Sequence, residues 1–251
     1  MARRDRGEVP RSGMVGWPQS LWLVRHGESQ GNVANALARK QRALRLEVEL
    51  NDAQIDLSSA GVEQAKALGG WIGAHPSDEQ PTVALVSPYV RARETARIVL
   101  DEADLAGLPI SYDERLRDRE QGVLDRLTGA GFRDRYPEES QRQSYVGKFW
   151  YRPTGGESWA DVVLRVRSVL LDLRLSLAGE RVLVVSHDMT ILAFRYVLES
   201  LTPDEALALS GRVQNCSVTK FEHEGRGLTL RAFSDTRALE MSRLAPVTAR
   251  D

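Results

Sequence analysis

LWLVRHGESQGN, residues 21–32, is the stretch of this chain that decides the fold. Its four leading apolar residues predict a short buried strand, and that strand stops at Arg25 and His26. Ligands bind open α/β sheets at the carboxyl ends of the strands. We therefore expect both side chains at the rim of a crevice, where an imidazole flanked by a guanidinium suits nucleophilic catalysis on an anionic substrate.

Outward from this strand, short apolar runs alternate with helical patterns. Strands are expected at 83–86, 110–112, 181–186, 218–222 and 228–233, and helices at 33–49, 59–75, 91–105, 159–177, 189–200 and 204–210. This order predicts a single-domain α/β fold, an open and mostly parallel sheet with helices on both faces. The expected domain covers 21–236, after a disordered tail over 1–20 and before a tail of unassigned structure over 237–251.

The bulk composition excludes several functional classes. The 34 basic and 35 acidic side chains nearly balance, which disfavours a nucleic-acid partner. No apolar run has membrane-spanning length, and residues 1–20 lack the apolar core of a secretory signal. We therefore expect a cytoplasmic protein without a membrane partner. The single Cys216 and four scattered histidines predict no metal site. A homodimer is left open.

Three expected strand ends carry groups that suit a single site. Arg25 and His26 follow the first strand, Ser87 leads to Arg91 after the second, and His187 follows the last buried strand. A doubly wound sheet brings such ends together. A neutral imidazole can attack phosphorus, guanidinium groups neutralise phosphoryl oxygens, and a carboxylic acid must protonate the leaving oxygen. This chemistry requires both imidazoles to meet in one solvent-accessible pocket.

Four motifs in a fixed order carry a family resemblance: RHGESQGN at 25–32, DLSSAGVEQA at 56–65, SPYVRARETA at 87–96 and VLVVSH at 182–187. Over about residues 21–221 the chain resembles the histidine phosphatase superfamily, which includes the cofactor-dependent phosphoglycerate mutases. The resemblance implies a phosphoglycerate mutase-like fold and a phosphohistidine at His26. It implies that the phosphoryl group is held by Arg25, Asn32, Arg91 and His187, with no metal or other cofactor.

The proton donor is open between four carboxylates. The resemblance favours Asp118, at a position where the family more often has the longer Glu. Glu120 and Glu114 lie near it in the sequence. Asp188 directly follows His187, as the donor aspartate does in the acid phosphatase and phytase branch.

Other polar residues are expected around the substrate. Glu28, Ser29 and Asp188 are candidates for substrate contact, although Glu28 and Ser29 can instead cap the helix that follows them. Six basic side chains either contact a second anionic group of the substrate or only form a solvated face: Arg39, Lys40, Arg42, Arg45, Arg142 and Lys148.

Two stretches bear on the choice of substrate. Residues 122–128 and 133–139 look like the bisphosphatase domain of the bifunctional enzyme acting on fructose 2,6-bisphosphate, but Gly129 stands where that enzyme has a substrate-binding tyrosine. The longer proline-rich insertion of the mutases is missing. We therefore expect a phosphomonoesterase that hydrolyses a small phosphorylated metabolite, such as a sugar phosphate. The alternatives are a cofactor-dependent phosphoglycerate mutase and a non-catalytic module that binds a phosphorylated ligand.

Overall fold

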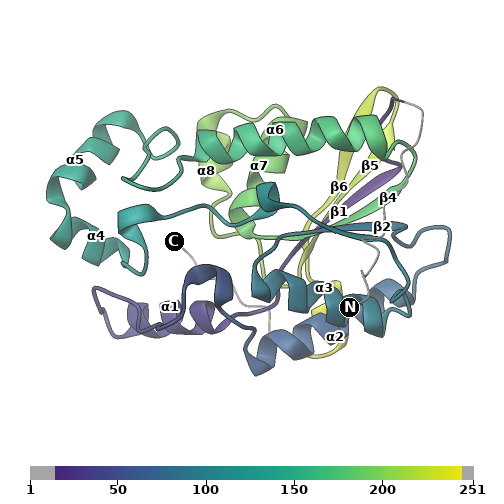
Figure 1. Cartoon of the computed structure of the whole chain (residues 1–251), viewed down its shortest axis with the longest axis horizontal. Helices are drawn as coiled ribbons and strands as arrows, with labels where there is room; N and C mark the ends of the chain where they lie inside the picture. Colours follow the sequence, from purple (N-terminus) through teal and green to yellow (C-terminus); the bar gives the residue numbers. More distant parts are fainter. Residues whose placement is uncertain (1–14, 245–251) are drawn as a thin grey trace, which may run out of the picture.

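One sheet organises residues 15–244, the part of the chain that this computed structural model describes (Figure 1). Its strand order is β3-β2-β4-β1-β5-β6, and the strands span Ser20–Arg25 (β1), Val83–Val86 (β2), Ile110–Tyr112 (β3), Arg181–Ser186 (β4), Val218–Glu224 (β5) and Gly227–Asp235 (β6). The first four are mutually parallel, whereas β5 runs antiparallel to β1 and to β6. The predicted α/β class and mostly parallel sheet are confirmed.

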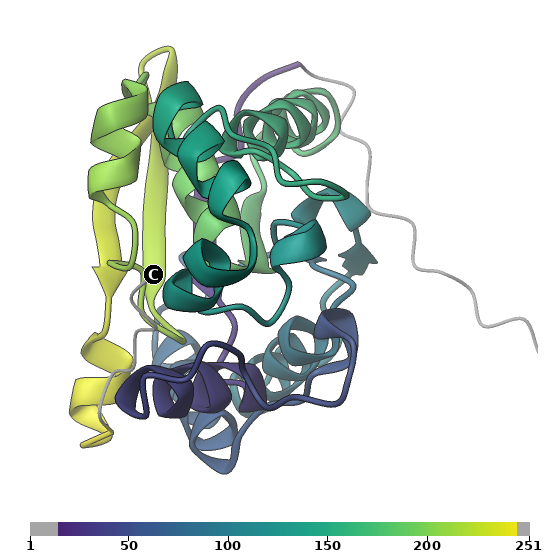
Figure 2. The same ribbon diagram turned by 90° about the vertical axis from the view of Figure 1, so that its left-hand side faces the viewer.

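Helices cover both faces of the sheet (Figure 1). They span Gln30–Lys40 (α1), Ser59–Gly73 (α2), Val90–Glu102 (α3), Gly129–Arg135 (α4), Pro137–Val146 (α5), Trp159–Ser176 (α6), Asp188–Leu198 (α7), Pro203–Ala208 (α8) and Arg237–Met241 (α9). Helices α6 and α7 pack on one face, and α2, α3 and α9 pack on the other. Helices α1, α4 and α5 gather beyond the sheet at one end of the molecule (Figure 2). No helix of residues 15–244 is long and apolar enough to span a bilayer.

The alternation of side chains along β1 divides the core in two. Leu21 and Leu23 belong to the cluster under α6 and α7, whereas Trp22 and Val24 belong to the cluster under α2 and α3. All four are fully buried, as expected for a central strand covered on both faces. This double burial holds the end of β1, and therefore Arg25, in a fixed position.

The boundaries of the two expected tails need correction. Residues 16–19 are not a disordered tail: the amide of Gly16 donates to the carbonyl of Arg174, and that of Gln19 to the carbonyl of Glu180. Ser20, also inside that expected tail, is the first residue of β1. Residues 1–14 lie outside the described residues. At the other end, α9 gives structure to part of the tail left unassigned, and its Leu239 is buried. Residues 245–251 also lie outside the described part.

The helix expected over 33–49 ends much earlier. Helix α1 stops at Lys40, and Arg42 adopts a left-handed conformation with φ of 55°. The amide of Ala43 then donates to the carbonyl of Ala38 at 2.8 Å, which is the Schellman termination that usually has glycine at the left-handed position. Because arginine stands there, the sequence carried no stop signal.

The chain after α1 is instead tied to a second irregular segment. The amide of Thr128 donates to the carbonyl of Leu44, and the amide of Leu46 donates to the carbonyl of Arg126. A Cβ added at Gly131 would lie 1.8 Å from the carbonyl oxygen of Leu44, so only glycine permits this approach. Residues 41–55 and 118–131 thus form one connected layer over the end of the sheet.

Candidate functional site

Three neighbouring parallel strands end at the candidate site. The register pairs Arg25 of β1 with Ser186 of β4, and Val86 of β2 with Val185 of β4. The residues that follow these strands, including His26 and His187, therefore meet at one edge of the sheet. The two imidazole rings lie edge to face with centroids 5.1 Å apart, so the predicted convergence of the strand ends is present.

The protonation of His26 follows from its contacts. Its Nδ1 lies 2.7 Å from the carbonyl oxygen of Gly27, so we assign the proton to Nδ1 and leave Nε2 with a lone pair. Burial, followed by the charges of Arg91 and the neighbouring His187, holds the pKa of His26 well below its usual value. The ring is therefore neutral at neutral pH, and Nε2 keeps a lone pair that accepts from Nε of Arg91 and makes it a candidate nucleophile.

Gly27 is required by the close approach of another helix. A Cβ there would lie 2.5 Å from the carbonyl oxygen of Gly61, near the start of α2. A Cβ on Gly61 would in turn lie 2.0 Å from the carbonyl oxygen of Glu28. The amide of Gly27 donates to the hydroxyl of Thr95 at 2.9 Å. Two glycines thus let α2 pack directly behind the histidine.

His187 is completely buried, contrary to the requirement that both imidazoles reach solvent. Its Nε2 lies 2.8 Å from the Ser87 hydroxyl, and its Nδ1 lies 3.4 Å from Oδ2 of Asp118, which lines the pocket. Burial and the charge of Arg91 lower the pKa of His187 well below its usual value. Asp118 lines the pocket and contacts this imidazole, whereas His187 itself is not part of the lining.

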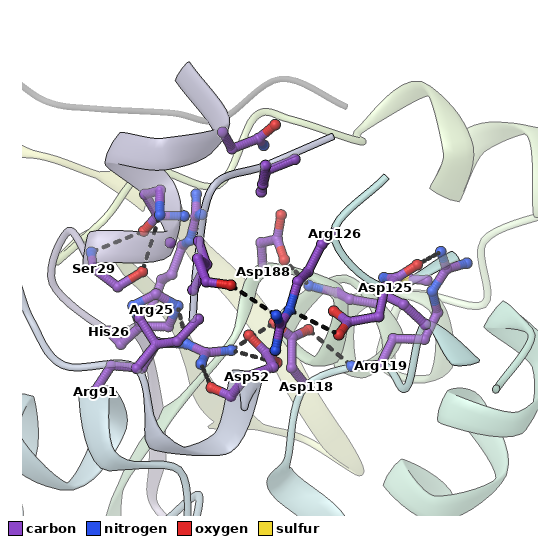
Figure 3. A pocket seen from close by; sticks show the side chains of 18 of the residues that line it. Arg25, His26, Ser29, Asp52, Arg91, Asp118, Arg119, Asp125, Arg126 and Asp188 are labelled. Atoms are coloured by element: carbon purple, nitrogen blue, oxygen red, sulfur yellow. Dashed lines mark hydrogen bonds and ion pairs between the residues drawn. The ribbon is translucent and has the colours of Figure 1, made fainter. Parts of the chain in front are cut away.

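Both guanidinium groups expected from the sequence, those of Arg25 and Arg91, line the pocket. Arg25 lines it and donates from Nη1 to the carbonyl of Val213 at 2.7 Å. Arg91, on α3, has a side chain only 4 % exposed. Its Nε lies 3.3 Å from Nε2 of His26, and its Nη2 donates to Oδ2 of Asp52 and to Oδ2 of Asp118, each at 3.1 Å (Figure 3). Arg91 therefore connects the candidate nucleophile with the candidate acid.

The other residues of the first motif divide between the pocket and the scaffold. Ser29 and Asn32 cap α1 reciprocally, and both line the pocket. The side-chain oxygen of Asn32 also accepts from Asn215 at 3.2 Å. Glu28 does not line the pocket: its carboxylate accepts a hydrogen bond from Ser58, the N-cap of α2, at 2.6 Å. Substrate contact by Glu28 stays a prediction, and the described contact of its carboxylate is with the N-cap residue of α2.

The four candidate acids are separated by their positions. Asp118 and Asp188 line the pocket, and one oxygen of Asp188 accepts from the amide of Met189 at 2.7 Å. Glu114 and Glu120 lie outside the lining, and Glu120 accepts a hydrogen bond from the amide of Gly122 instead. Only Asp118 of the four is hydrogen-bonded to Arg91.

Most of the six basic residues, which the sequence left open between substrate contact and a solvated face, lie outside the pocket lining. Of the six, only Lys148 lines the pocket, because Arg42 and Arg45 lie beyond the early end of α1 and Arg142 is exposed on α5. The sequence reasoning missed further pocket residues: Asp52, Arg119, Asp125 and Arg126. Each lies in an irregular segment without a strand end or motif to mark it. Figure 3 shows these side chains facing those of the sheet edge.

Comparison with known proteins places these features in a family. The model of the histidine phosphatase superfamily (branch 1) matches residues 21–236. The chain belongs to the histidine phosphatase superfamily. A curated relative, 2,3-bisphosphoglycerate-dependent phosphoglycerate mutase 2 of Gloeobacter violaceus, is 31% identical over 212 residues, which cover 82% of this chain and 87% of the relative.

Solved structures of other superfamily members have the same fold. A mycobacterial glucosyl-3-phosphoglycerate phosphatase matches 87% of this chain and 100% of its own, with a TM-score of 0.66 and 25% identity. The α-ribazole phosphatase of Shigella flexneri covers 86% of this chain and 96% of its own, with a TM-score of 0.68 at 22% identity. The superfamily thus includes both mutases and phosphatases among the proteins that this chain resembles.

Proposed function

We propose that this protein is a phosphomonoesterase that hydrolyses a small phosphorylated metabolite through a phosphohistidine at His26. One observation carries the proposal. The unprotonated Nε2 of His26 lies 3.3 Å from Nε of Arg91, and the same guanidinium is hydrogen-bonded to Asp118 at 3.1 Å. A nucleophile, an anion-binding group and a proton carrier therefore share one pocket.

In the first half-reaction Nε2 of His26 attacks phosphorus while the bond to the leaving oxygen breaks. Arg25 and Arg91 neutralise the phosphoryl oxygens. Asp118, entering this step protonated, gives its proton to the leaving oxygen, so the alcohol departs neutral. The carbonyl of Gly27 keeps the proton on Nδ1 and stabilises the positive charge that the ring acquires.

In the second half-reaction the same carboxylate works as a base. Asp118 takes a proton from water, and the hydroxide attacks phosphorus. The P–N bond breaks, its electron pair returns to Nε2 of His26, and inorganic phosphate leaves. The Ser87 hydroxyl donates a hydrogen bond to Nε2 of His187, so the ring proton of His187 lies on Nδ1. Nδ1 donates to a phosphoryl oxygen once Asp118 moves aside.

The test is turnover of p-nitrophenyl phosphate and of a panel of phosphorylated metabolites by the purified protein. Phosphate release by the wild type, absent in His26→Ala, is the expected result. Wild-type protein that binds phosphate esters without releasing phosphate would instead be a binding module.

A mutase activity is the second candidate, favoured by the curated relatives with that name at 31–34% identity. A mutase must protect its phosphoenzyme from water, whereas a phosphatase must admit water. The assay is interconversion of the phosphoglycerates with the bisphosphate primer present. Conversion faster than phosphate release would replace hydrolysis by transfer as the main activity.

A further inference from the structure

The anion-binding arginine of this site already holds an anion from its own chain. Nη1 of Arg91 donates to the carbonyl oxygen of Asp52 at 2.5 Å, and Nη2 donates to the Asp52 carboxylate at 3.1 Å. The Asp118 carboxylate occupies the same Nη2. Nε of the same guanidinium donates to His26. Its Nη2 therefore already donates to two carboxylates before any substrate binds.

Asp52 is placed on Arg91 by a built local structure. It opens the short 3-10 helix Asp52–Gln54 (η1), whose N-cap Asn51 accepts a hydrogen bond from the amide of Ala53 at 3.0 Å. Ile55, at the end of that helix, is buried. The backbone at Asp52 is therefore anchored, whereas its side chain is 45% exposed and lines the pocket.

The charges around Asp52 weaken its ion pair with Arg91. Burial raises the pKa of this carboxyl, the positive charge of Arg91 opposes that rise, and the negative charges of Asp118 and Asp125 add to it. Because two neighbouring carboxylates repel Asp52, breaking its ion pair with Arg91 costs less free energy than it would for an isolated carboxylate. An incoming phosphoryl group offers the same fork of oxygens with more charge.

On the basis of the proposed phosphatase function, we propose that Asp52 is an internal anion, which the substrate phosphoryl group displaces from Arg91 and which returns to expel product phosphate. Asp52 is then a positioning residue: it acts through Arg91 and not on the reacting atoms. Its return lowers the affinity for phosphate, because two anions compete for one guanidinium. This favours hydrolysis, whose last step is phosphate release.

The experiment is a calorimetric titration of the full-length protein with inorganic phosphate, which needs no turnover. Asp52→Asn removes the charge but keeps the backbone carbonyl, and it should bind phosphate about ten-fold more tightly than wild type. Asp56→Asn is the matched control, since Asp56 lies on the same segment with an exposed side chain. Its phosphate affinity should equal that of the wild type.

Equal or weaker binding of phosphate by Asp52→Asn would overturn the proposal, as would an equal gain in Asp56→Asn. Asp52→Ser, checked for a cooperative unfolding transition, repeats the test if the asparagine variant fails to fold. Failure of the proposed function is distinguished by a separate assay: a wild type that binds phosphate but does not hydrolyse p-nitrophenyl phosphate refutes catalysis. If the protein is a phosphatase, the inhibition constant of product phosphate should be lower in Asp52→Asn than in the wild type by the same factor.

Discussion

The two walls of the pocket are built in different ways. The sheet wall holds Arg25, His26 and Arg91, which follow buried strands or lie on a packed helix and are each 3% exposed. The loop wall holds Asp52, Asp118, Arg119, Asp125, Arg126 and Lys148, which belong to irregular segments and line the pocket with partly exposed side chains. Groups that need one fixed geometry lie in the rigid wall, and among them burial lowers the pKa of His26. Groups that must release or adapt to a ligand lie in the other wall.

This contrast predicts the largest loss of activity in the sheet wall. His26→Ala should lower kcat by about 10³-fold or more, because no phosphoenzyme can form without the nucleophile. The control is His223→Ala, an exposed histidine on β5. Rapid-quench trapping of labelled protein should detect the phosphohistidine in the control only. Labelled protein in His26→Ala would mean that another residue is the nucleophile.

A loop-wall acid should have an effect that depends on the leaving group. Asp118→Asn should slow alkyl phosphates about 10²-fold, because a poor leaving oxygen needs the proton. Formation of the phosphoenzyme from p-nitrophenyl phosphate should change little, since nitrophenolate leaves without one. Single-turnover rates with both substrate types measure this directly. Equal slowing would count against Asp118, and Asp188→Asn would then be the variant to test.

The buried imidazoles of the sheet edge should make stability depend on pH. The pKa values of His26 and His187 are both lowered well below 6.5. Below pH 6.5 the unfolded chain therefore binds protons that the native state does not. As the pH decreases, the free energy of unfolding falls by about 1.4 kcal/mol per pH unit per histidine. Urea unfolding between pH 5.5 and 7.5 measures the free energy of unfolding at each pH. Its dependence on pH should be weaker in His187→Asn than in the wild type, and an identical dependence would contradict the lowered pKa of His187.

The smallest effect is expected at Lys148 of the loop wall. If Lys148 contacts a second anionic group, Lys148→Ala should raise KM for a bisphosphorylated sugar about five-fold, with kcat nearly unchanged. KM for p-nitrophenyl phosphate should not change. Arg142→Ala is the control, because Arg142 is exposed and outside the pocket lining. A uniform rise of KM for both substrates would place Lys148 at the phosphoryl group instead.

The sheet wall was open to prediction because its signals are local. A run of apolar residues that ends in Arg25 and His26 predicts both a buried strand and polar groups at its carboxyl end. The apolar run before His187 has the same pattern. The loop wall carried no such signal. Arg42 ends α1 in a conformation usually left to glycine, so the helix was predicted too long. Asp52 lies in a polar stretch outside the four motifs, whereas exposed Asp56 opens the motif at 56–65, so no motif pointed to Asp52.

The sequence by itself determined the α/β class, the parallel strands and the residues that meet at their ends, because hydrophobic periodicity and strand ends act over a few neighbouring residues. Only the tertiary structure decided that Glu28 turns to the N-cap of α2, that Asp118 contacts His187, and that Asp52 reaches Arg91. These are contacts between side chains 30 to 69 positions apart. They depend on where loops cross in space, which no local pattern records.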